Sequence, residues 1–121
     1  MKNNRLTLIL AIIILLSSCV QKTYRKTVVF LLQTDALKQI EKVGIRGNDK
    51  PLNWDTDVEM TPVVQDSLYK ATVTFITGYK FTEVKFVIND RIELENKDNR
   101  KVTFSENDTT IYKAKFDIIN P

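Results

Sequence analysis

The sequence predicts an all-β protein: a single antiparallel β-sandwich of about seven strands, preceded by a cleaved helical signal peptide. Apolar and polar residues alternate over several short segments, and turn-forming pairs such as Asn-Asp and Gly-Asn separate these segments. The part of the chain that follows the signal peptide is long enough for one domain only. Short strands spaced in this way are typical of an immunoglobulin-like sandwich.

The expected strands follow from two kinds of pattern. An apolar run predicts a buried strand over residues 27–33, and strict alternation predicts strands with one inward face further along the chain. The expected segments are residues 27–33, 43–46, 69–75, 84–88, 91–95, 102–104 and 112–118. The alternating side chains expected in the core are Tyr69, Ala71, Val73, Phe75, Val84, Phe86, Ile88, Val102, Phe104, Tyr112, Ala114, Phe116 and Ile118.

The only candidate for a helix after the signal peptide is residues 35–42, which we expect to form one turn at most.

The first eighteen residues have the composition of an export signal. Lys2 and Arg5 precede an apolar run over residues 6–16, which is too short to cross ~30 Å of hydrocarbon as a helix. The run ends in Leu-Ser-Ser-Cys, which resembles the lipobox of bacterial lipoproteins. This resemblance implies cleavage before Cys19 and acylation of the Cys19 sulfur. It divides the chain into a signal peptide (1–18), a lipidated cysteine with a basic tether (19–26) and the sandwich (27–119).

Cys19 is the only cysteine of the chain, which agrees with lipidation, because an exported protein rarely carries an unpaired thiol. The alternative is an ordinary secretory signal with an incidental cysteine. Cys19 is followed directly by Val20 rather than Asp, so the inner-membrane retention signal of some bacteria is missing. We therefore expect a cell-envelope protein anchored in the lipid bilayer through Cys19, at the periplasmic face of the outer membrane, with surface exposure left open.

Composition excludes most other function classes. Removal of residues 1–18 from the 121-residue chain leaves 103 residues, with 16 of the 18 basic side chains against 15 acidic ones. This near-neutral, interspersed charge argues against a nucleic-acid partner. The chain has no His and no cysteine besides Cys19, so it lacks an imidazole base, a catalytic triad and the usual zinc ligands. We expect no catalytic residues, no metal and no cofactor.

Two carboxylate patterns in the sequence have simpler explanations than catalysis or metal binding. Glu93 and Glu95 would share one face of a strand at a spacing near that of paired glycosidase carboxylates, but catalytic pairs normally come from separate elements. The simpler interpretation is a half-buried strand, with Ile92 and Leu94 inward and the two glutamates in solvent. The acidic residues at positions 55, 57 and 59 lack the spacing and the turn glycine of a calcium loop.

Four short motifs carry a second resemblance. They are Gly47 followed by Leu52-Asn53-Trp54, then Val84-Lys85-Phe86, then Glu93-Leu94-Glu95, then Asn99-Arg100. In order and spacing they resemble the starch-binding carbohydrate-binding modules of family 20 and related glycogen-recognition sandwiches, over about residues 27–117. The resemblance implies that Trp54 stacks on a sugar ring, Lys85 and Asn99 donate to hydroxyls, and Glu93 accepts from them. The family's second stacking tryptophan is Leu94 here, which is a poor partner for a sugar face.

Two functions follow. The first is a noncatalytic lipoprotein module that binds an oligosaccharide or polysaccharide, most simply an α-glucan, and could serve a partner hydrolase. The alternative is a structural lipoprotein whose sandwich has lost sugar binding and docks another envelope protein. Trp54 could also simply pack over one end of the sandwich. An exposed Trp54 beside Lys85 and Asn99 favours sugar, whereas a buried Trp54 with an uncovered apolar edge strand favours a protein.

Overall fold

The computed structural model describes residue 4 and residues 22–35 and 37–119. The expected signal peptide, residue 4 apart, and Cys19 therefore lie outside the described residues. Within the described part of the chain, no helix is long and apolar enough to cross a membrane.

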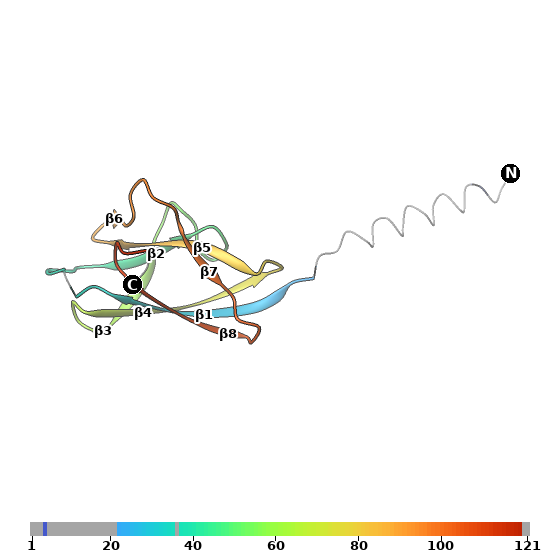
Figure 1. Ribbon diagram of the computed structural model, residues 1–121, viewed down its shortest axis with the longest axis horizontal. Coiled ribbons are helices and arrows are strands. Elements are labelled where there is room, and N and C mark those ends of the chain that lie inside the picture. The colour runs from blue at the N-terminus through green and yellow to red at the C-terminus, as the bar shows by residue number, and fades with distance from the viewer. Residues whose placement is uncertain (1–3, 5–21, 36, 120–121) are drawn as a thin grey trace.

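The described domain is built from strands, which confirms the all-β prediction (Figure 1). In chain order the strands are β1 (Tyr24–Gln33), β2 (Val43–Gly47), β3 (Val58–Val64), β4 (Leu68–Thr77), β5 (Phe81–Ile88), β6 (Arg91–Ile92), β7 (Arg100–Thr103) and β8 (Thr109–Lys115). They form a curled sheet with the order β6-β5-β2-β3-β4-β1-β8, and β7 pairs with the first half of β5.

The sheet folds over on itself at β3, which produces two layers. The first half of β3 pairs with β2 over Val58 to Met60, and the second half pairs with β4 from Thr61 onward. The register shifts between Pro62 and Val64, where a bulge bends the strand. Figure 1 shows the result: β2, β5 and β7 lie in one layer, and β1, β4 and β8 lie in the other.

Four details differ from the sequence-based expectations. β1 begins at Tyr24, so the last three residues of the expected tether belong to the domain. β3 was not expected, because Pro62 and the charges around it hide the strand pattern. The segment expected as a strand over residues 91–95 pairs only through Arg91 and Ile92. β8 runs parallel to β1, although every other strand pair is antiparallel.

The described residues of 35–42 form no helix.

The core lies between the two layers and follows the predicted alternation. In β4 the side chains of Tyr69, Ala71, Val73 and Phe75 are buried, as expected. Phe30 of β1 bridges the layers, since its ring centre lies 6.1 Å from that of Phe86 in an edge-to-face arrangement. The other members predicted for β5 and β7 are buried too: Val84, Ile88, Val102 and Phe104.

The pattern fails at the C-terminal end of the domain. Ala114 is buried and Tyr112 and Phe116 are partly buried, but Ile118 is 46% exposed rather than inward. β8 ends at Lys115, and Asp117 has a φ of 66°, which turns the chain away from the strand direction.

Candidate functional site

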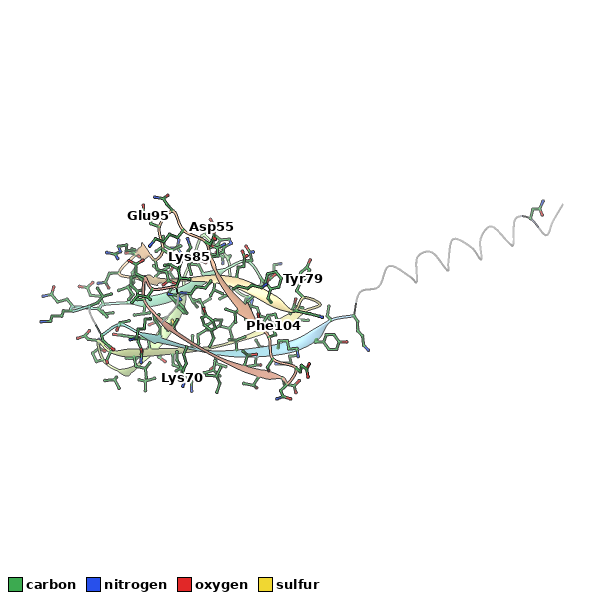
Figure 2. All side chains as sticks on the ribbon, viewed as in Figure 1. Asp55, Lys70, Tyr79, Lys85, Glu95 and Phe104 are labelled. Carbon is green, nitrogen blue, oxygen red and sulfur yellow. The ribbon has the colours of Figure 1, made fainter. Side chains whose placement is uncertain are left out.

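The outer surface of β2 and β5 carries a group of polar side chains, which we call the β5 face. Its members are Arg46, Glu83 and Lys85 on the strands and Asn48, Trp54 and Asn99 on the adjoining loops. Val84 and Phe86 are fully buried, so alternation turns Glu83 and Lys85 outward, and Lys85 lies opposite Arg46 in the register. Figure 2 shows Lys85 and Asp55 on this side of the molecule and Lys70 on the opposite side.

A chain of hydrogen bonds runs across the β5 face. The indole Nε1 of Trp54 donates to Asn48 Oδ1 at 2.7 Å, which fixes the orientation of the ring. The amides of Asn48 and Asn99 both donate to Glu83 Oε2, at 3.4 Å and 3.2 Å. Trp54, Glu83 and Asn99 are half-buried, and Asn48 is exposed. Two positions expected from the resemblance, 54 and 99, are therefore brought together through two residues that sequence reasoning did not select.

The loop that carries Trp54 is held at both ends. At its start, Asp49 accepts a 2.6 Å hydrogen bond from Thr82, and Leu52 is buried in the core. At its end, the side-chain oxygen of Asn53 accepts from the backbone N–H groups of Asp55 and Thr56, at 2.9 Å and 2.8 Å, which forms an Asx-type turn. These contacts place Trp54 at a fixed position beside the strand rather than on a free loop tip.

Arg46 supports the same loop from below. Its guanidinium donates to Asp57 at 2.5 Å and to the backbone carbonyl of Trp54 at 3.2 Å. Asp57 can approach β2 only because residue 44 is glycine: a Cβ at Gly44 would lie 2.6 Å from Asp57 Cβ. Glycine at residue 44 therefore helps to position Trp54, because it lets Asp57 approach Arg46, which contacts the Trp54 carbonyl.

Lys85 lies on the β5 face as expected, but its ammonium group already has partners in the protein. Lys85 Nζ donates to the backbone carbonyls of Leu94 and Lys97, both at 2.9 Å. A lysine ammonium has three donors, so one remains for a ligand. Lys85 therefore holds the loop after β6 against the sheet in addition to lying on the β5 face.

The expectation that Glu93 accepts hydrogen bonds from a ligand is wrong. Glu93 is fully buried, and its carboxylate accepts two hydrogen bonds from Arg100, at 2.7 Å and 2.8 Å. The backbone N–H groups of Phe86 and Asp117 complete its contacts, at 2.8 Å and 3.0 Å. A ligand cannot reach this carboxylate. Glu93 and Arg100 form a buried structural ion pair.

The inward direction of Glu93 follows from its pairing with β5. Its backbone N–H donates to the carbonyl of Phe86 at 3.0 Å, and residues opposite each other in an antiparallel pair face the same side, so Glu93 points inward with the buried Phe86. Leu94 has a φ of 52°, so the chain leaves the extended conformation there, and Leu94 is buried too, at 1% exposed. The position at which the resembling family has its second stacking aromatic is part of the packed interior here.

A different aromatic is available on the β5 face. Phe81 is 41% exposed and precedes Glu83 by two residues on the same side of β5. The ammonium group of Lys101 lies 4.5 Å from the centre of its ring, a cation–π contact. Phe81 did not stand out in the sequence because it is one of six phenylalanines, but the alternation that identified Lys85 also places Phe81 and Glu83 beside it.

The chemistry available on the β5 face is hydrogen bonding and stacking. Within residues 22–35 and 37–119, no group of three or more His, Cys, Asp or Glu side chains could hold a metal ion. No known family model matches the sequence, and no curated protein matches it. The functional argument therefore depends on the residues themselves.

Proposed function

We propose that the protein is a noncatalytic module of the cell envelope, anchored by a lipid on Cys19, that binds an oligosaccharide or polysaccharide on the β5 face. The observation that carries the proposal is the hydrogen-bonded chain from Trp54 through Asn48 and Glu83 to Asn99. It holds an aromatic ring and planar polar groups side by side on one surface.

This arrangement matches the two kinds of surface that a sugar presents. A pyranose ring has an apolar C–H face that packs on an aromatic ring, and a rim of hydroxyls that pairs with amides and carboxylates. In the described part of the chain, Glu83 Oε1 and Asn99 Oδ1 have no hydrogen-bond partner and are free to accept from hydroxyls. Phe81 supplies a second apolar surface in place of the buried Leu94.

The ligand that the resemblance to starch-binding modules favours is an α-glucan. The sharpest test is affinity electrophoresis of residues 20–121 in gels with soluble starch, glycogen or a β-glucan. We expect starch and glycogen to retard the wild type, and Trp54→Ala to abolish the retardation. Tyr79→Ala is the matched control, because Tyr79 is an exposed aromatic outside the β5 face. A folded wild type that no glucan retards would refute the α-glucan proposal.

A second candidate function is docking of another envelope protein, and one observation favours it. β8 is an edge strand whose only partner in the described sheet is β1, and Ile111 on it is 64% exposed. An edge strand with an exposed apolar side chain can accept a strand from a partner. A photo-crosslinking residue at position 111 in cells, compared with one at position 55, tests this. A discrete adduct at 111 alone would support docking, and its absence would count against it.

A further inference from the structure

We propose that the end of the domain where β1 begins lies directly on an anionic lipid bilayer, so that the protein is held by its surface as well as by its lipid. We call this end the anchor end; its residues are Lys22, Tyr24, Arg25, Lys26, Tyr79 and Lys80. The inference rests on the anchoring part of the proposed function, but not on sugar binding.

The distance between Cys19 and the domain is short. Lys22 follows Cys19 by three residues, and an extended chain of that length spans at most about 11 Å. The backbone at Lys22 is close-packed against the turn between β4 and β5: a Cβ on Gly78 would lie 3.0 Å from the Lys22 carbonyl oxygen. Pairing of Tyr24 with Thr77 then continues into the sheet. If Cys19 carries an acyl chain, the anchor end therefore lies next to the lipid headgroups, because the chain between them is too short to form a spacer.

The side chains at the anchor end suit a membrane interface. Tyr24 is 52% exposed and Tyr79 is 68% exposed, and Figure 2 shows Tyr79 at the end of the domain where β1 begins. Tyrosine is enriched at membrane interfaces because its ring is apolar and its hydroxyl is polar. Lys22 lies over the ring of Tyr24, 5.9 Å from its centre.

Charge at the anchor end is predominantly positive. Arg25 and Lys80 are exposed, and Lys26 is held by backbone carbonyls of the neighbouring loop, of which Ser105 O is the nearest at 3.1 Å. The opposing charges on this end are Glu106 and Asp108. These groups surround an open hollow of about 1030 Å³, with Tyr24, Arg25, Lys26, Tyr79 and Lys80 in its wall together with both acidic residues. Cations near an anionic leaflet each strengthen attachment about fivefold, and salt screens the effect.

The lone cysteine makes a direct test possible. Residues 19–121 can be coupled through Cys19 to a maleimide lipid in vesicles of phosphatidylcholine, with or without phosphatidylglycerol. The reporter is Tyr79→Trp in a Trp54→Phe background, quenched by lipids brominated near the headgroup. The control reporter is Val64→Trp in the same background, since Val64 is 55% exposed near the opposite end of β4.

We expect strong quenching at position 79 and weak quenching at position 64. Quenching at position 79 should be stronger with phosphatidylglycerol and should fall by roughly half with Arg25→Glu and Lys80→Glu, or in high salt. Equal quenching at the two positions would overturn the proposal. Insensitivity to lipid charge, salt and both substitutions would overturn it as well, because tethering alone would then account for the signal.

The test is independent of the proposed function, because the coupling is chemical. Mass spectrometry of the protein from cells decides whether Cys19 is acylated, and affinity electrophoresis decides sugar binding without a bilayer. The quenching result can therefore be interpreted even if Cys19 is not acylated in cells or no sugar binds.

Discussion

Glu93 and Arg100 form a two-pronged ion pair in the interior of the domain, with side chains that are 0% and 1% exposed. Arg100 also donates to the carbonyl of Lys115 at 2.7 Å, and Glu93 accepts from the N–H groups of Phe86 and Asp117. The pair therefore joins β5, β7 and the segment after β8. Burial by itself lowers the pKa of Arg100, but the hydrogen bond and charge of Glu93 outweigh it and raise that pKa above its usual value, so Arg100 stays charged.

Replacement of Glu93 by Gln is expected to destabilise the domain by about 3–5 kcal/mol, because it leaves the buried guanidinium without a counter-charge. Urea unfolding of residues 20–121 measures the change. Lys42→Ala is the control, since its pair with Asp90 is exposed to solvent, and its unfolding midpoint should not move. The double variant Glu93→Gln with Arg100→Met should recover part of the loss, because no uncompensated charge remains and the Gln oxygen can still accept from a backbone N–H group. A loss no larger than that of Lys42→Ala would contradict this role of the pair.

Replacement of Glu83 by Ala is expected to weaken α-glucan binding about tenfold, or about 1.4 kcal/mol, with little effect on stability. Asn48 and Asn99 lose their shared acceptor, so the polar groups beside Trp54 lose their fixed orientation. Affinity electrophoresis over a range of glucan concentrations measures the change. Glu95→Ala is the matched control, because Glu95 is an exposed carboxylate outside this chain of hydrogen bonds. Equal effects of the two substitutions would argue against a specific role for Glu83.

Replacement of Gly44 by Ala is expected to cost about 1–3 kcal/mol, because the new Cβ collides with Asp57. Asp57 would then have to leave Arg46, which also supports the Trp54 loop. A double-mutant cycle with Asp57→Gly isolates the collision, since Gly44→Ala should cost much less in that background. Thermal unfolding measures all four proteins, and additive costs would contradict the prediction.

Replacement of Lys85 by Met is expected to loosen the loop after β6. Lys85 donates to the carbonyls of Leu94 and Lys97, and hydrogen bonds that involve a charged group are each worth about 1.5–3 kcal/mol. Hydrogen exchange should therefore become faster at the backbone amides of residues 94–97. Lys70→Met on the opposite layer is the control. Unchanged exchange would mean that Lys85 has no structural role and is available entirely for a ligand.

The site was only partly predictable from the sequence. The alternation of β5 correctly predicted that Lys85 points outward, and the resemblance to starch-binding modules selected Trp54 and Asn99, which contact Asn48 and Glu83 on the same face. The roles of Asn48 and Glu83 were missed because they depend on one carboxylate oxygen that accepts from two separate loops. Local sequence patterns do not show which side chains from separate loops will meet.

The sequence by itself determined the all-β class and the inward faces of β4, β5 and β7, because these depend on local periodicity. Only the tertiary structure decided the path of β3, the parallel pairing of β1 with β8 and the burial of Glu93. Each of these depends on distant segments that meet: a bulge carries β3 between layers, and Arg100 compensates the charge of Glu93 inside the core. Alternation predicts which way a side chain points only while the backbone stays extended, and at Leu94 it does not.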